Sequence, residues 1–128
     1  MRERARVFLI EDDQTLIKVE RLYIENAGHE IILFASSREE ALEKIAEAEA
    51  KVINVAVIDG NLGSGPNDGP EIAKALKEKI PEVKVISFSG ELVSWGDFNP
   101  HEPSDITNLG KVISQAIFIK GGEDDINN

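Results

Sequence analysis

The chain has 128 residues, the usual size of one globular domain, and its hydrophobic fraction of 41% is enough to build one core. The absence of cysteine excludes disulfide bonds, thiolate zinc sites and cysteine nucleophiles. A formal net charge of −10 argues against nucleic acid as a partner, because phosphates repel a strongly acidic surface. No segment is long and apolar enough for a membrane span or a signal peptide, so we expect no membrane contact and a cytoplasmic location.

The first third of the chain predicts a strand, a helix and a second strand. Residues 6–10 are mostly apolar and predict a buried strand. Asp13 can cap a helix over residues 14–27, and residues 30–35 predict the second strand. The apolar face of the helix is expected to contain Leu16, Val19, Leu22 and Tyr23.

The middle third continues this alternation. Ser37 and Glu40 form a capping box before a helix that is expected to run to about residue 50. Residues 52–58 predict a third strand, and its almost continuous apolar character indicates that helices cover both faces of the sheet there. A loop rich in glycine and proline follows over residues 59–70.

The last third predicts a helix over residues 70–80, a strand over residues 83–88 and a final helix over residues 106–119. The interval between residues 89 and 104 is too short for both a full helix and a strand. We therefore expect one of these two elements to be short or missing. Residues 121–128 form an acidic tail that has little to bury and is expected to be disordered.

Alternating strands and helices with short loops predict an α/β fold with a parallel sheet and right-handed crossovers. We expect one domain over residues 1–120, followed by the tail at 121–128, and no output domain within this chain. No internal repeat is visible.

Three carboxylates follow two of the predicted strands directly. Glu11 and Asp12 come after the first strand, and Asp59 comes after the third. If these strands are neighbours, the three groups meet beyond their carboxyl ends, where open α/β sheets bind ligands. A hard divalent cation with oxygen ligands would relieve the repulsion between them. The simpler alternatives are a solvated strand end for the acidic pair and a turn at Asp59 before Gly60.

Four pieces of the chain, in this order and spacing, resemble the receiver domain of two-component response regulators. They are Val-Phe-Leu-Ile-Glu-Asp-Asp at 7–13, Val-Ala-Val-Ile-Asp-Gly-Asn-Leu-Gly at 55–63, Gly-Pro-Glu-Ile-Ala at 69–73 and Val-Ile-Ser-Phe-Ser-Gly at 85–90. The resemblance implies a flavodoxin-like doubly wound sheet with strand order 2-1-3-4-5, which would place the first and third strands side by side.

The resemblance also implies roles for individual residues. Asp59 would accept a phosphoryl group from a histidine kinase, a phosphotransfer protein or a small phosphodonor. Mg²⁺ would be held by Glu11, Asp12, Asp59 and the backbone carbonyl of Asn61. Ser89 would be the switch hydroxyl that turns toward the phosphoryl group, although Ser89 before Gly90 also fits an ordinary turn.

The chain departs from the family near its last helix. The family's lysine before a proline is replaced by Glu102, whose charge would repel an acyl phosphate. His101 could substitute only in part, because histidine is mostly neutral at pH 7, and Lys111 lies within the last helix pattern. Either Trp95 or Phe98 could take the place of the family's aromatic switch residue.

These observations lead to one functional hypothesis and two alternatives. The hypothesis is a response regulator receiver that accepts a phosphoryl group on Asp59 with Mg²⁺ and signals to an unidentified target protein. It would not be an enzyme beyond its own phosphorylation and slow hydrolysis. The first alternative is a degenerate receiver that binds partners without phosphorylation, which Glu102 favours. The second is a small metal-dependent phosphohydrolase, against which the chain offers no phosphate-cradling Gly-Lys loop.

Overall fold

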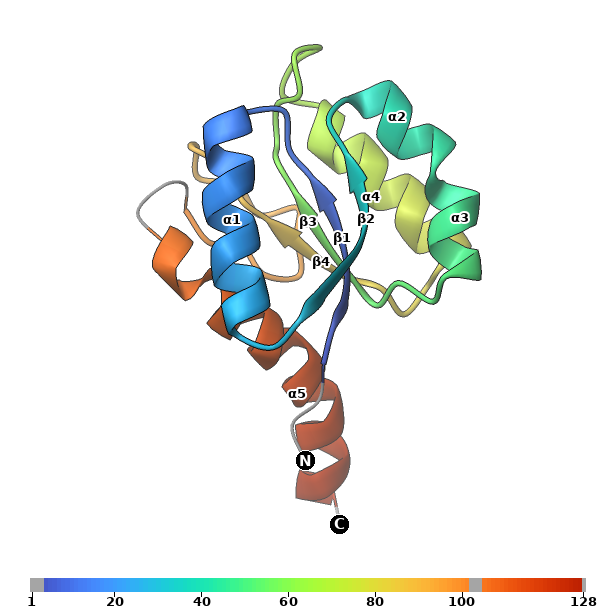
Figure 1. Cartoon of the computed structure of the whole chain (residues 1–128). Coiled ribbons are helices and arrows are strands. Elements are labelled where there is room, and N and C mark those ends of the chain that lie inside the picture. Colours follow the sequence, from blue (N-terminus) through green and yellow to red (C-terminus); the bar gives the residue numbers. More distant parts are fainter. Residues whose placement is uncertain (1–3, 102–104, 128) are drawn as a thin grey trace.

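A computed structural model describes residues 4–101 and 105–127 and contains a parallel four-stranded sheet between two layers of helices (Figure 1). The strands pair in the order β2-β1-β3-β4. Their bounds are β1 (Arg6–Ile10), β2 (Glu30–Ala35), β3 (Val55–Ile58) and β4 (Lys84–Ser87). The predicted flavodoxin-like fold class and the pairing of the first strand with the third are confirmed.

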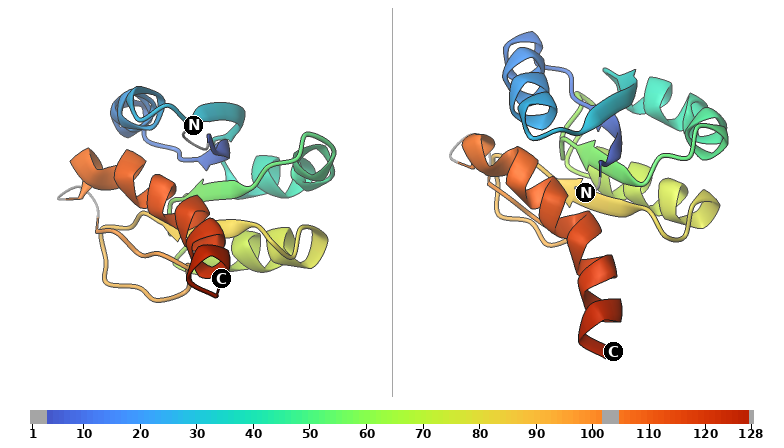
Figure 2. Two further views of the ribbon diagram at one scale, coloured as in Figure 1. Left: turned by 90° about the horizontal axis from the view of Figure 1, so that it is seen from below. Right: turned by 60° about the horizontal axis from the view of Figure 1, so that its bottom comes forward.

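Helices cover both faces of the sheet, as the apolar third strand predicted (Figure 2). One layer contains α1 (Gln14–Asn26), the short 3-10 helix η1 (Ile106–Asn108) and α5 (Leu109–Asn127). The other contains α2 (Arg38–Glu43), α3 (Ile45–Ala50) and α4 (Asp68–Lys79). Alternate residues of β3 point into the two cores: Val55 and Val57 pack on the α5 side, and Ala56 and Ile58 pack on the α4 side.

Two element boundaries differ from the prediction for local reasons. The third strand begins at Val55 and not at residue 52, because Val52 is an exposed turn residue with a φ of 59°. The helix expected to run to residue 50 is broken at Lys44, whose backbone leaves the helical region. The predicted caps are confirmed at Asp13 and Ser37, which accept hydrogen bonds from the first turns of α1 and α2.

The buried face of α1 also differs from the prediction. Leu22 is 53% exposed, whereas Glu20 and Ile24 are buried. At the other end of the chain, the backbone of α5 continues through Asn127, beyond the predicted end at residue 119. The domain boundary near residue 120 stays a prediction. No helix in the described part of the chain has the length and apolar composition needed to span a bilayer.

The segment after β4 lacks the full fifth strand of the predicted order. Among its described residues no helix forms, and two isolated parallel bridges, Ile86 with Phe98 and Ser89 with His101, stand in the fifth strand's place. This confirms that an element is missing here. Residues 95–99, which we call the edge segment, lie along the free edge of β4.

Several hydrogen bonds hold the edge segment on β4. The N–H of Asp97 donates to the carbonyl of Val85 (2.7 Å), and the Asp97 carboxylate accepts the N–H of Val85 in return (2.8 Å). The N–H of Ser87 donates to the carbonyl of Phe98 (2.9 Å). Lys77 of α4 forms an ion pair with Asp97 at 2.8 Å. The edge of β4 is thereby covered without a regular strand.

Candidate functional site

The site lies beyond the carboxyl ends of β1 and β3, at the top of Figure 1. The parallel register pairs Ile10 with Ile58, so the residues that follow them lie at the same level of the sheet. The backbone contacts continue past the strands, because the N–H of Asp59 donates to the carbonyl of Ile10 (3.0 Å). Regular sheet geometry therefore brings Glu11 and Asp59 together.

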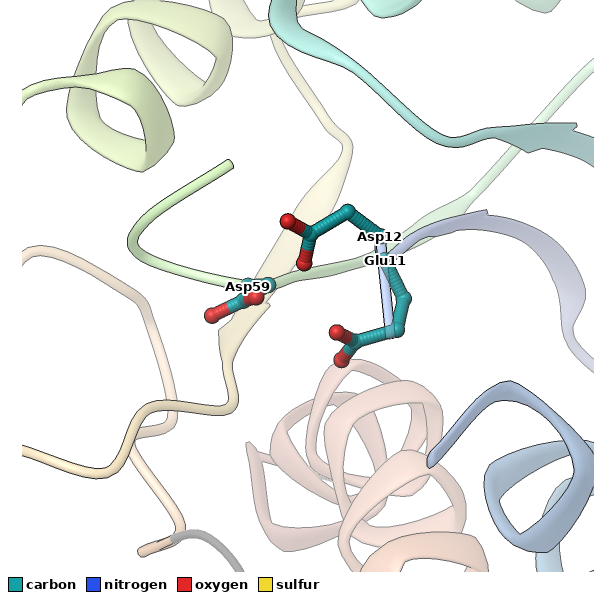
Figure 3. Close-up of side chains that lie close together, drawn as sticks. All are labelled: Glu11, Asp12 and Asp59. Atoms are coloured by element: carbon teal, nitrogen blue, oxygen red, sulfur yellow. The ribbon is translucent and has the colours of Figure 1, made fainter. Parts of the chain in front are cut away.

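Glu11, Asp12 and Asp59 each place a carboxylate oxygen within 4.8 Å of the other two (Figure 3). Glu11 is buried, Asp59 is half-buried and Asp12 is exposed. The three residues therefore form a group with a closed inner side and an open outer side. The convergence expected from the sequence is present in the structure.

Burial raises the pKa of Glu11 well above its ordinary value, and the charges of Glu20 and Asp59 raise it further. The backbone N–H of Asp13 donates to a Glu11 oxygen (3.1 Å) and lowers the pKa by a smaller amount. The surroundings of Glu11 therefore favour its protonated form unless a positive charge enters the site.

Burial also raises the pKa of Asp59, to about 6. The N–H of Asn61 donates to Asp59 (3.3 Å) and lowers this pKa, whereas the nearby charge of Asp12 raises it. Among the described residues no lysine or arginine forms an ion pair with Asp59. The carboxylate is thus held in surroundings that favour its neutral form.

Oxygen donors, an open side and mutual repulsion together fit a small divalent cation. Mg²⁺ prefers oxygen ligands and retains several waters, so it needs few ligands from the protein. A cation between the three carboxylates would favour their charged forms and oppose the effect of burial. The backbone carbonyl of Asn61, which the resemblance adds to the metal ligands, stays a prediction.

The acceptor loop, which we define as residues 59–67, is shaped by Asp68 at the start of α4. Its buried carboxylate accepts the N–H groups of Leu62 (2.8 Å) and Ser64 (3.0 Å). Gly63 and Gly65 have positive φ values, which glycine adopts without strain. The loop that carries Asp59 and Asn61 is therefore held from within.

Ser89 lies beside the acceptor loop and is largely buried. A Cβ built on Gly60 would lie 3.3 Å from the Ser89 Oγ, so this hydroxyl is adjacent to the residue after Asp59. The Oγ accepts the N–H of Glu91 (3.1 Å). The turn interpretation and the switch interpretation of Ser89 are therefore compatible with each other.

The two candidate aromatic residues lie on different sides of the sheet. Phe98 packs against the core below α5, and Trp95 packs against the core below α4, next to the acceptor loop. Glu102, which takes the place of the family's lysine, lies outside the described residues. Lys111 is exposed on α5.

Sequence reasoning missed two buried acids near the site. Glu20 is 1% exposed and its charge faces Glu11 from α1. It lies four residues after Leu16 and four before Ile24, a spacing that places all three on one side of a helix. Asp68 was missed because it precedes Pro70, where the helix was expected to begin.

The family model for the response regulator receiver domain matches residues 7–94. No curated protein matches the chain in sequence. A CheY-like response regulator receiver domain protein from Methanospirillum hungatei JF-1 has a similar structure. It is 21% identical with a TM-score of 0.77, and the match covers 94% of this chain and 99% of that one.

Two other solved structures show the same likeness. A response regulator receiver domain protein from Clostridium thermocellum is 24% identical with a TM-score of 0.76, and the match covers 91% of this chain and 97% of that one. The response regulator PhyR from Brucella abortus is 20% identical with a TM-score of 0.79, and the match covers 99% of this chain but 53% of that one. At these identities the likeness shows a shared fold.

Proposed function

We propose a function from one premise: this chain belongs to the response regulator receiver domain family. We infer that the chain accepts a phosphoryl group on Asp59 in the presence of Mg²⁺. Domains of this family are generally signalling modules without an enzymatic activity of their own. Catalysis by the chain would then be limited to its own phosphorylation and slow dephosphorylation. A cytoplasmic location remains a prediction from the sequence.

One observation carries the proposal: carboxylate oxygens of Glu11, Asp12 and Asp59 lie within 4.8 Å of one another at the ends of two paired strands. An aspartate is a poor nucleophile toward a phosphoryl group because both are negative. A bound Mg²⁺ would neutralise this charge and orient the transferred group.

The residues of the site would have three roles: metal binding, attack on phosphorus and hydrogen bonding to the new phosphoryl group. Glu11, Asp12 and the carbonyl of Asn61 would hold the metal with Asp59. An Asp59 carboxylate oxygen would attack phosphorus, the bond from phosphorus to the donor's nitrogen or oxygen would break, and the leaving group would keep the electron pair. The Ser89 hydroxyl would donate a hydrogen bond to a new phosphoryl oxygen, since these oxygens are strong acceptors.

The test is to incubate the protein with acetyl phosphate and Mg²⁺ and to measure its intact mass. We expect one phosphoryl adduct, which is lost in Asp59→Asn and when Mg²⁺ is removed with a chelator. Glu43→Gln is the matched control, because Glu43 is an exposed carboxylate on α2, away from the site. It removes one charge, as Asp59→Asn does, and should leave the adduct unchanged.

The alternative of a receiver that signals without phosphorylation is favoured by Glu102 in the place of the family's lysine. It predicts no adduct in the wild type together with unchanged partner binding by Asp59→Asn. A histidine kinase or phosphotransfer protein would be the partner under the first proposal, and an unidentified target protein under either. Both would bind through protein contacts.

A further inference from the structure

Trp95 packs into a gap that two glycines leave beside Asp59. A Cβ built on Gly69 would lie 2.5 Å from the Trp95 Cζ2 and 2.6 Å from its Cη2. A Cβ built on Gly60 would lie 3.6 Å from the same Cζ2. The N–H of Gly69 donates to the carbonyl of Gly60 (3.2 Å), so the two glycines lie side by side. We call this surface the glycine notch.

The glycine notch is adjacent to the reacting group. Gly60 directly follows Asp59, and Gly69 lies in the first turn of α4. The indole of Trp95 therefore lies against the start of the acceptor loop and against the first turn of α4, which follows that loop. Neither glycine has a positive φ, so glycine is needed at Gly69 because of close neighbours: the ring of Trp95 and, at 3.0 Å from a Cβ there, the Gly60 Cα.

Residues 90–94, which we call the flap, connect Ser89 to Trp95, and both of these residues lie against Gly60. At one end of the flap, Ser89 lies against Gly60, and at the other end Trp95 does. Between these ends Leu92 is 93% exposed. Any displacement of Gly60 therefore acts on both ends of the flap.

Past Trp95 the chain is tightly attached to β4. Gly96 has no room for a side chain, because a Cβ there would lie 2.8 Å from the N of Ser87. Its N–H donates to the Asn99 Oδ1 (2.9 Å), and Asp97 is bonded to both Val85 and Lys77. The edge segment therefore holds the backbone of Trp95 in place, while the flap has fewer bonds to the rest of the fold.

We propose that Trp95 is a positioning residue that transmits the state of Asp59 to the flap through the glycine notch. The inference rests on the proposed phosphorylation of Asp59. If Ser89 turns toward the phosphoryl group, its Oγ leaves the N–H of Glu91. The first end of the flap then moves, while Trp95 keeps the second end against the acceptor loop. The flap must change shape between these two ends.

The contact itself is tested by a double-mutant cycle of Gly69→Ala and Trp95→Ala, with urea unfolding followed by circular dichroism. In the wild type we expect Gly69→Ala to lower the urea midpoint, since the new methyl group displaces the indole. In Trp95→Ala we expect Gly69→Ala to lower the midpoint less, because only the contact of the new methyl group with the Gly60 Cα at 3.0 Å remains and alanine is the better helix former. Gly69→Ala should also shift the emission of Trp95, the chain's one tryptophan, to longer wavelength.

The transmission is tested by amide hydrogen exchange over residues 90–99, with and without acetyl phosphate and Mg²⁺. In the wild type we expect phosphorylation to change exchange in the flap by about threefold or more. When the variants and the wild type are compared at the same fraction of phosphorylated Asp59, this change in exchange should be lost in Trp95→Ala and partly retained in Trp95→Phe. Leu92→Ala is the control on the flap itself and should keep the change.

The outcomes separate the two proposals. If no adduct forms in the wild type, the proposed function fails and the transmission fails with it, while the double-mutant cycle still decides whether Trp95 occupies the glycine notch. If the adduct forms and Trp95→Ala responds like the wild type, the inference is overturned and the proposed function stands. If the effects of Gly69→Ala and Trp95→Ala on unfolding were additive, Trp95 would not contact Gly69 in solution.

Discussion

Two aspartates, one in the acceptor loop and one in the edge segment, have surroundings of opposite kinds. Burial raises the pKa of Asp59 to about 6, and its nearest charged neighbours are acids. Burial alone would also raise the pKa of Asp97, but Lys77 and the N–H of Val85 lower it on balance. The edge segment therefore favours a carboxylate, and the acceptor loop disfavours one.

The difference separates a group that supports the fold from a group that is available for chemistry. The charged form of Asp97 stabilises the fold, because both of its partners, the N–H of Val85 and the Lys77 ammonium, belong to the chain. Asp59 accepts the backbone N–H of Asn61, but no lysine or arginine pairs with it among the described residues, so a cation from solution can supply the missing positive charge.

The largest effect is expected from Asp68→Ala. This buried carboxylate accepts two backbone N–H groups of the acceptor loop, and its removal leaves both without an acceptor. We expect a loss of about 2–4 kcal/mol in the free energy of unfolding, measured with urea. Asp68→Asn keeps one acceptor oxygen and should lose less. Equal losses in the two variants would show that the loop does not depend on these bonds.

Asp97→Ala should cost about 1–2 kcal/mol, because the buried N–H of Val85 loses its partner and Lys77 loses its ion pair. The pKa of Asp97 is lowered in the folded state, so its contribution is present at neutral pH and is lost as pH falls below about 4. The difference between wild type and variant should therefore shrink in acid. If the difference in the free energy of unfolding grew in acid instead, the pKa of Asp97 would have to be raised in the folded state and not lowered.

Asp59→Asn should have the opposite sign and stabilise the protein without metal by about 1 kcal/mol at pH 7, after allowance for solvent screening. The folded pKa of about 6 lies above the ordinary value, so the unfolded chain ionises first and the wild type loses stability as pH rises from about 4 to 6. The two proteins should be equal near pH 4. Thermal unfolding at several pH values measures this, and Mg²⁺ should stabilise only the wild type.

The acidic site could be predicted because it depends on regular structure. Apolar runs that end in Glu11 and Asp59 predict strands, and parallel pairing then brings their next residues together. The alternation of strands and helices predicts the layers and the parallel sheet, whereas the order of the strands came from the resemblance to the receiver family. The strands and layers need only short-range patterns and the rules of sheet geometry, and the resemblance then makes the first and third strands neighbours.

The remaining features depend on contacts between distant parts of the chain. The burial of Glu20 and the exposure of Leu22 reverse what their polarity suggests, because the rotation of α1 is set by its packing and not by hydropathy alone. The contact of Trp95 with Gly69 joins residues 26 positions apart without any periodic pattern. Such contacts become visible only when the tertiary structure is known.

The smallest effect is expected from Lys111→Ala. If α5 supplied the positive charge that Asp59 lacks, Lys111 would have to face the site. It is exposed, whereas Leu109, Gly110 and Ile113 of the same helix are buried, so its side chain lies on the solvent side of α5. We therefore expect the rate of labelling by acetyl phosphate to change by less than about twofold, as for the exposed Lys74→Ala control on α4. A large loss specific to Lys111→Ala would mean that the acceptor site does have a cation from the fold, and the contrast between Asp59 and Asp97 would no longer hold.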